Sequence, residues 1–125
     1  MYARHAPRLR ITTSGTPETA LVLHLDGQVD QGEHVLLDAG LARAVKERPP
    51  RLVIDLAGLT FCDSTGLNAL LRTRLEALAT GVELVLASPP PQVKRLLELT
   101  GTDGVFTIRD DVPAALTGPI TPDRG

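Results

Sequence analysis

The chain has 125 residues, carries 13 lysines and arginines against 15 aspartates and glutamates, and so has a formal net charge of −2. That length suits one domain with a single core, and the near-even charge excludes the basic excess typical of nucleic-acid binders. The lone cysteine, Cys62, excludes an intrachain disulfide and a zinc site of clustered cysteines. No run approaches the roughly 18 apolar residues of a membrane helix, and no apolar segment follows the basic N-terminus. We therefore expect a cytoplasmic protein that contacts neither membrane nor nucleic acid directly.

The first half of the chain predicts a hairpin followed by a helix. Residues 9–13 and 20–25 read as strands, and the turn residues at 14–18 favour an antiparallel connection between them. Residues 26–30 are predicted to form a loop. From 31 to 47 the apolar residues recur at intervals of three and four, which indicates a helix. The residues expected on its buried face are Leu37, Leu41, Ala44 and Val45.

The second half alternates strands with helices. The predicted strands are 51–56, 82–86 and 105–108, and the predicted helices are 64–79, 92–99 and 111–116. Residues 57–63 are predicted to form a loop. The inward-facing residues are expected to be Leu67, Leu70, Leu71, Arg74, Leu75 and Leu78 in the first of these helices and Val93, Leu96 and Leu97 in the second. Strands separated by helices predict a mostly parallel α/β sheet, with the opening antiparallel strand at one edge. Residues 9–116 then form one domain between an N-terminal tail, 1–8, and a Pro/Gly-containing C-terminal tail, 117–125, that we expect to be disordered.

The densest polar group within an apolar frame is Phe61-Cys62-Asp63-Ser64-Thr65-Gly66-Leu67. Either Asp63 or Ser64 is placed to accept hydrogen bonds from the first free N–H groups of the following helix. The positive end of that helix would stabilise an anion by about 0.3–1 kcal/mol, so a phosphate on Ser64 or Thr65 would be tolerated. The local pattern alone favours plain helix capping over a phosphorylation switch.

Three blocks of sequence carry a wider resemblance. They are RLVIDLAGLTFCDSTGLNALL at 51–71, LDGQVD at 25–30 and LASPPPQVKRLLELTGTDGVFTI at 86–108. In order and spacing, from about 9 to 116, the chain resembles the STAS domain of bacterial anti-sigma factor antagonists. The resemblance implies a single STAS-like domain, with a mostly parallel five-stranded sheet, an N-terminal antiparallel hairpin and about four helices.

The resemblance also implies a regulatory binding protein, without catalytic residues, metal or cofactor. Members of the family bind an anti-sigma factor that is also a serine kinase with a Bergerat-type ATP-binding fold, and this binding frees the sigma factor. The kinase phosphorylates the first serine of the D-S-[ST]-G motif, which is Ser64 here, and the phosphorylated form binds poorly. A PP2C-type phosphatase restores binding. Thr65 is a second, less favoured acceptor.

The residues carried over by position are Ser64, its neighbour Asp63, and the acidic residues Asp26 and Asp30. The predicted partner-binding set adds Thr65, Gly66, Asn68 and Lys94. The sequence departs from the family at Asn68, where many members have glycine, and at Gln28, where many have glutamate. Neither position is the acceptor. Because interface residues determine pairing, these departures leave the identity of the partner open.

Two other functions compete with the switch. One is a hydrolase with Ser64 as nucleophile, but the chain has no G-x-S-x-G motif and no histidine in a recognisable triad motif. The other is a constitutive STAS scaffold in which Ser64 is never phosphorylated.

Several polar residues also have a purely structural interpretation. Asp26 and Asp30 can be turn formers, with Asp30 capping the helix that follows. His24 is expected to be partly buried and hydrogen-bonded, and Cys62 to be a small buried apolar residue. Lys94 and Arg95 are most simply solvated charges, although they could border the partner surface.

Overall fold

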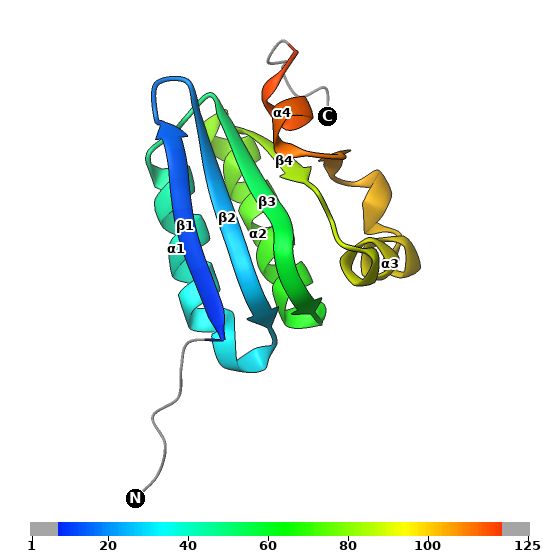
Figure 1. The fold of residues 1–125 in the computed structure, drawn as a ribbon. Coiled ribbons are helices and arrows are strands. Elements are labelled where there is room, and N and C mark those ends of the chain that lie inside the picture. The colour runs from blue at the N-terminus through cyan, green and yellow to red at the C-terminus, as the bar shows by residue number, and fades with distance from the viewer. Residues whose placement is uncertain (1–7, 119–125) are drawn as a thin grey trace, which may run out of the picture.

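The computed structural model describes residues 8–118. The elements are β1 (Leu9–Thr16), β2 (Ala20–Val29), η1 (Gln31–Glu33), α1 (His34–Lys46), β3 (Arg51–Cys62), α2 (Ser64–Thr80), β4 (Glu83–Ala87), α3 (Pro91–Thr100), η2 (Thr102–Gly104), β5 (Thr107–Arg109) and α4 (Val112–Leu116). Figure 1 shows them from the N-terminus in blue to the C-terminus in red. Every predicted strand and helix is present.

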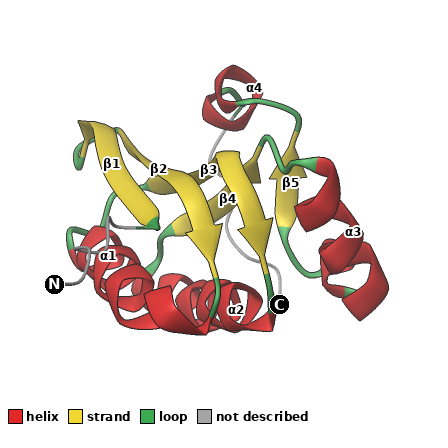
Figure 2. Cartoon of the chain, turned by 60° about the horizontal axis from the view of Figure 1, so that its bottom comes forward, coloured by secondary structure: helices red, strands yellow, loops and turns green. Residues whose placement is uncertain are grey.

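The five strands form one sheet in the order β1-β2-β3-β4-β5. The β1–β2 pair is antiparallel and the other three pairs are parallel, which confirms the predicted α/β sheet with an antiparallel strand at one edge. Helices α1 and α2 cover one face, α4 lies on the other, and α3 flanks the sheet beyond β5 (Figure 2). The sheet is therefore the middle layer of the domain.

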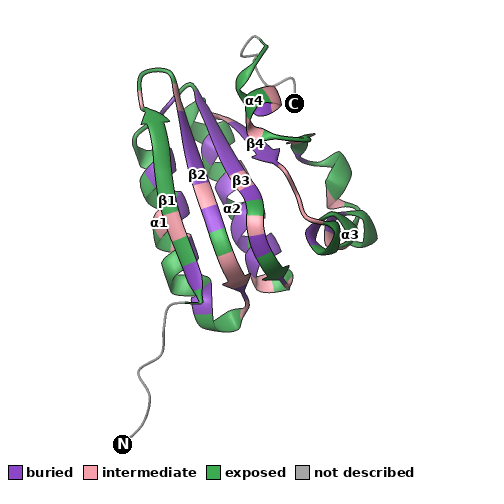
Figure 3. Cartoon of the chain, in the orientation of Figure 1, coloured by how far each residue is buried: buried purple, intermediate pink, exposed green. Residues whose placement is uncertain are grey.

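Two apolar clusters hold these layers together. The larger one fills the space between the sheet and α1 and α2, and it also takes in Val93 and Leu97 of α3. The smaller one, under α4, consists of Val22, Val53, Val85, Ala87 and Ala115, with Val112 packed against it. The burial map follows this division, since the purple segments lie along β2, β3 and the inner sides of α1 and α2, whereas β1 is largely exposed (Figure 3).

Strands β2 and β3 run further than the sequence predicts, so the predicted loops at 26–30 and 57–63 are wrong for most of their length. β2 continues to Val29 and β3 to Cys62. The pairing between them shifts register twice, once between His24 and Asp26 and once between Gly27 and Gln28. Irregular pairing interrupts the alternation of apolar and polar side chains, and the extended strands are hidden in the sequence for this reason.

The inward face of α2 also differs from the prediction. Leu75 is 63% exposed and Leu78 39% exposed, although both were predicted to face the core. Leu67 and Leu70 are buried as predicted, and Leu71 is partly buried against the core. The other buried residues of α2 are Gly66, Ala69, Thr73 and Ala77. Small residues let the helix lie close to the sheet, so the true inner stripe carries less apolar bulk than the stripe beside it. By contrast, the predicted inner faces of α1 and α3 are confirmed, with Leu96 only partly buried.

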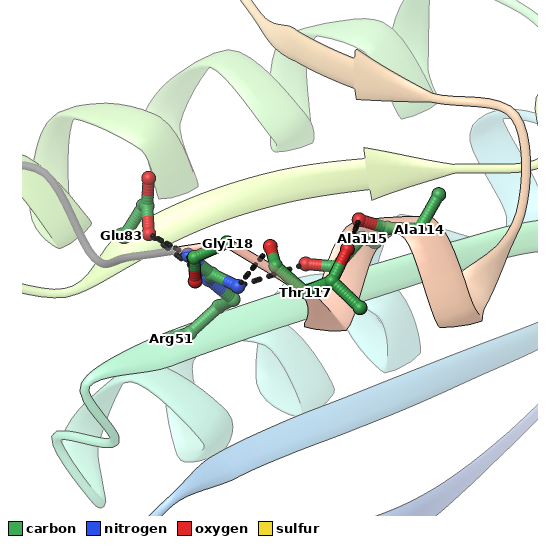
Figure 4. Close-up of polar contacts among 6 residues, drawn as sticks. All are labelled: Arg51, Glu83, Ala114, Ala115, Thr117 and Gly118. Atoms are coloured by element: carbon green, nitrogen blue, oxygen red, sulfur yellow. Dashed lines mark hydrogen bonds and ion pairs between the residues drawn. The ribbon is translucent and has the colours of Figure 1, made fainter.

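A buried arginine fastens the C-terminal end of the domain (Figure 4). The Arg51 Nε and Nη2 atoms each lie 2.9 Å from Oε1 of Glu83. The guanidinium also donates to the carbonyls of Ala115, Thr117 and Gly118, at 3.2, 3.0 and 3.2 Å. The first two residues of the predicted tail are thus bound to the start of β3. The rest of that tail, 119–125, and residues 1–7 of the N-terminal tail lie outside the described residues.

Candidate functional site

The predicted site lies where β2 and β3 end side by side. Val29 and Cys62 are register partners at the carboxyl ends of these parallel strands, and η1, leading into α1, and α2 begin directly after them. Figure 1 shows these helix starts beside the tips of β2 and β3. In open parallel sheets, ligand and partner sites commonly form at this edge.

Asp63 is the cap of α2, as predicted. Its Oδ1 accepts a hydrogen bond from the backbone N–H of Thr65 at 2.8 Å, and its own N–H donates to the Val29 carbonyl at 3.1 Å. Ser64 is therefore the first residue of α2, and it is exposed. Thr65 is partly buried, so the two hydroxyl residues of the motif differ in accessibility.

Gly66 is buried because α2 comes very close to the ends of both strands. A Cβ at this position would lie 2.5 Å from the Cys62 Sγ and 2.8 Å from Cγ1 of Val29. A heavier residue fits only if the Cys62 and Val29 side chains or the start of α2 shift. Gly66 thus acts on the site through the position of the helix that carries Ser64, whereas Asn68, one turn further along, is exposed.

The two acidic residues of 25–30 have different environments. Asp30 forms a capping box with Glu33: its Oδ1 accepts from the Gly32 N–H at 2.9 Å, while its own N–H donates to the Glu33 side chain at 3.1 Å. The hydrogen bond from the Gly32 N–H is the main cause of a lowered pKa of the Asp30 carboxyl. The capping interpretation of Asp30 is therefore confirmed, at the same edge as Ser64.

Asp26 lies within β2 rather than in a loop. The neighbouring Leu25 points into the core shared with α1 and α2, so Asp26 faces the opposite side of the sheet. Its carboxylate lies against Gly58, where a Cβ would be 1.7 Å from Oδ1. Among residues 8–118, no hydrogen bond or ion pair joins Asp26 to Ser64. The structure therefore does not bring Asp26 into contact with the acceptor loop.

Sequence reasoning missed Gln92, which ties α3 to this edge. Its Oε1 accepts from the Cys62 N–H at 2.9 Å, and its Nε2 donates to the Cys62 carbonyl at 2.8 Å. This contact brings the first turn of α3, with the exposed Lys94, towards the same edge. No local pattern marks Gln92, because its partner is a strand end 30 residues earlier.

Phe61 belongs to the same motif, three residues before Ser64, and its side chain is 40% exposed. Single exposed apolar side chains are common on protein surfaces. Phe61 is nevertheless an apolar side chain that a partner could cover at this end of β3.

The structure brings a serine, a histidine and an aspartate together, but not at Ser64. His24 bonds through Nδ1 to the Asp55 carboxylate at 2.7 Å and through Nε2 to the Ser14 hydroxyl at 3.0 Å. These three residues come from β1, β2 and β3. The prediction that His24 is partly buried and hydrogen-bonded is confirmed. No hydrogen bond between Ser64 and a histidine occurs within residues 8–118. The hydrolase hypothesis for Ser64 therefore has no histidine hydrogen-bonded to its nucleophile in the described part of the chain.

Cys62 has the predicted character of a small buried apolar residue. It is 2% exposed, and burial raises the pKa of its thiol to about 11, with a smaller contribution from the Asp63 carboxylate. The thiolate is therefore scarce at neutral pH.

Residues 8–118 lack two further features. That range contains no cluster of three or more histidine, cysteine, aspartate or glutamate side chains that could hold a metal ion. Nor does it contain a helix of the length and apolar character needed to span a bilayer.

Comparisons with known proteins agree with the geometry. The sequence matches the STAS domain family over residues 10–115. It is 30% identical over 97 residues to the anti-sigma-F factor antagonist RsfB of Mycobacterium tuberculosis, covering 78% of this chain and 79% of RsfB. A crystal structure of an anti-sigma factor antagonist from Mycobacterium paratuberculosis aligns with a TM-score of 0.76 at 28% identity, covering 89% of this chain and 94% of that one. The Bacillus protein SpoIIAA in its phosphorylated form shares the fold, with a TM-score of 0.66 at 19% identity over 85% of this chain and 96% of that one. The chain belongs to the STAS domain family.

Proposed function

We propose that this protein is a cytoplasmic anti-sigma factor antagonist controlled by phosphorylation of Ser64. In the unmodified state it binds an anti-sigma factor that is also a serine kinase of the Bergerat ATP-binding type, and the bound sigma factor is released. Phosphorylation by that kinase ends the interaction, and a PP2C-type phosphatase restores it. The observation that carries the proposal is the exposed Ser64 hydroxyl at the first position of α2, in a family with relatives that are anti-sigma factor antagonists.

The position of Ser64 is compatible with phosphate without refolding. The first turn of a helix has backbone N–H groups without intrahelical partners and a partial positive charge, which stabilises an anion by about 0.3–1 kcal/mol. The Asp63 carboxylate already bonds the Thr65 N–H and so opposes a second negative charge nearby. The attraction and the repulsion act in opposite directions at the helix start, and we expect the domain to stay folded when the phosphate is added. SpoIIAA, which shares the fold, has a structure in the phosphorylated form.

The same edge is suited to binding that is sensitive to charge. A phosphate adds about −1.5 to −2 charges at neutral pH beside Asp63 and Asp30. A partner that covers Phe61 and Ser64 must strip water from this phosphate, and the cost appears as lost affinity. A loss of about 2.8 kcal/mol is sufficient for a hundredfold weaker complex.

Ser64 is preferred over Thr65 as the acceptor. Ser64 is exposed, whereas Thr65 is partly buried and its backbone is held by Asp63. A kinase active site must reach the hydroxyl oxygen in line with the γ-phosphate, so the accessible hydroxyl reacts. Asn68 and Lys94 flank the acceptor on α2 and α3, and we assign them to the rim of the interface, with Asp26 on the adjoining face of β2.

Affinity capture from the host tests the proposal with three baits, which are the unmodified chain, Ser64→Ala and Ser64→Asp. The expected result is one ATP-binding serine kinase that is recovered on the first two baits and is strongly reduced on the third. In vitro, that kinase should phosphorylate the unmodified chain and leave Ser64→Ala unmodified, as read by intact mass. Equal recovery on all three baits, with no phosphate incorporated, would instead identify a constitutive scaffold.

A further inference from the structure

Within residues 8–118, the end of β3 has a strand neighbour on one side only. β4 pairs with β3 only from Arg51 to Asp55, so the outer edge of β3 has no paired strand from Leu56 to Cys62. On the inner side, the Asp63 N–H bonds the Val29 carbonyl of β2. In an extended chain, neighbouring residues direct their N–H and C=O groups to opposite sides, so Cys62 presents both of its groups to the uncovered side.

The Gln92 side chain takes the place of the missing strand there. Its amide accepts from the Cys62 N–H at 2.9 Å and donates to the Cys62 carbonyl at 2.8 Å, which is the pair of bonds that a neighbouring strand would make. A primary amide is the side-chain group that offers one acceptor and one donor in this geometry. The peptide before Asp63 is thus held from both flanks, by β2 on one side and by α3 on the other.

We infer that Gln92 is the positioning residue of the phosphoacceptor site. Within residues 8–118 Gln92 makes no hydrogen bond to Ser64, and it acts through the chain from Cys62 to Thr65. Fixing the Cys62 peptide fixes Asp63, and the Asp63 carboxylate then holds the first turn of α2 through the Thr65 N–H. Ser64 lies between these two anchored residues. The inference has a structural test, which does not depend on the proposed function. It also has a kinetic test, which rests on the proposed function.

The structural part is measured on the unmodified full chain by amide hydrogen exchange. Gln92→Met keeps the length of the side chain and removes both hydrogen bonds, and Glu98→Met, at an exposed position further along α3, is the matched control. In Gln92→Met, exchange at Cys62 should rise about tenfold or more, and exchange at Asp63 and Thr65, whose bonds Gln92 does not make, should rise severalfold. Glu98→Met should leave all three within twofold, and Gly32 should be unchanged in both variants. Unchanged protection at Asp63 and Thr65 in Gln92→Met would overturn the inference.

A second variant separates the two bonds. Gln92→Glu keeps an acceptor for the Cys62 N–H but places a carboxylate against the Cys62 carbonyl at neutral pH. In this variant the Cys62 N–H should stay protected from hydrogen exchange, whereas the Asp63 and Thr65 N–H groups should still exchange faster. If Asp63 and Thr65 keep full protection, the bond to the Cys62 carbonyl has no part in positioning, and the two-sided account is wrong.

The kinetic part uses the kinase that phosphorylates Ser64. Because the position of a nucleophile affects the chemical step more than binding, kcat should fall about tenfold in Gln92→Met with KM little changed. Glu98→Met should match the unmodified chain. Faster exchange at Asp63 and Thr65 with an unchanged kcat would make Gln92 a structural tie only and overturn the positioning role. If no kinase phosphorylates the unmodified chain, the proposed function fails, and the exchange at Asp63 and Thr65 alone decides the inference.

Discussion

Replacing Arg51 with methionine should destabilise the domain severely. The Arg51 side chain is 5% exposed and the Glu83 side chain 19%, and the guanidinium also bonds three carbonyls of the C-terminal segment. Removing one partner of a buried ion pair costs about 3–5 kcal/mol because the other charge is left without compensation. Glu83 and the Thr117 and Gly118 carbonyls can regain some water, so the lower end, about 3 kcal/mol, applies here.

A second arginine provides the control. Arg72 makes an ion pair of the same 2.9 Å length with Asp38, but the two side chains are 59% and 41% exposed. Exposed pairs contribute about 0.2–1 kcal/mol. Arg51→Met should therefore lower the urea midpoint by about 1–3 M, with m in the range of about 1–3 kcal/mol/M, whereas at the same m Arg72→Met should move it by about a third of that or less. Equal midpoint losses in the two variants would refute the argument from burial.

The remaining predictions concern α2 and its cap. Gly66→Ala gains about 1 kcal/mol in helix propensity but meets Cys62 at 2.5 Å, and overpacking costs about 1–3 kcal/mol. Gly66→Ala should therefore lower the urea midpoint. Gly104→Ala, where a Cβ would have no atom within 4 Å, should leave the midpoint unchanged. A higher midpoint in Gly66→Ala would contradict the close approach of α2 to Cys62. Asp63→Ala should lose about 1 kcal/mol of stability by removing the cap, while Asp63→Asn, which keeps the acceptor, should lose less; equal losses would argue against capping. Because burial raises the pKa of Cys62 from 9.0 to about 11, the stability tied to its neutral thiol is intact below pH 9 and declines as the pH rises towards 11. Between about pH 9 and 11 the urea midpoint of the chain without substitution should fall more steeply than that of Cys62→Ala. If the midpoints of the two proteins changed in parallel with pH, the buried thiol would be contradicted.

Much of the fold could be predicted because local and global signals agree. The apolar spacing in α1 and the Asp63 cap of α2 depend on neighbours within a few residues, and both were correct. The continuous apolar run at the start of β3 is typical of a strand buried on both faces, and Leu52, Val53, Ile54 and Leu56 are buried in the structure.

The predictions that were wrong, for the ends of β2 and β3 and for the inner face of α2, depend on contacts between residues distant in sequence. The extension of β2 and β3 depends on irregular pairing between them, and Asp55 supports it by accepting from the Ala57 N–H and from His24 across the sheet. The inner face of α2 is set by how closely it approaches Val29 and Cys62, not by which stripe is most apolar.

The candidate site was likewise predicted only where its residues are close together in the sequence. Ser64, Asp63 and Gly66 lie in one short motif, and the structure places them together at the ends of β2 and β3. Gln92 was missed because only the folded chain brings α3 against Cys62, and Asp26 was placed in a loop because the strand around it is irregular.

The central claim is that one phosphate on Ser64 switches the protein off. The most direct measurement is the Kd between the anti-sigma kinase captured from the host and this chain, prepared unmodified and prepared with phosphoserine at position 64, by calorimetry in the same buffer. Binding of the phosphorylated form should be weaker by about a hundredfold, or about 2.8 kcal/mol, while both forms stay equally folded by circular dichroism. Two Kd values within threefold of each other would contradict it.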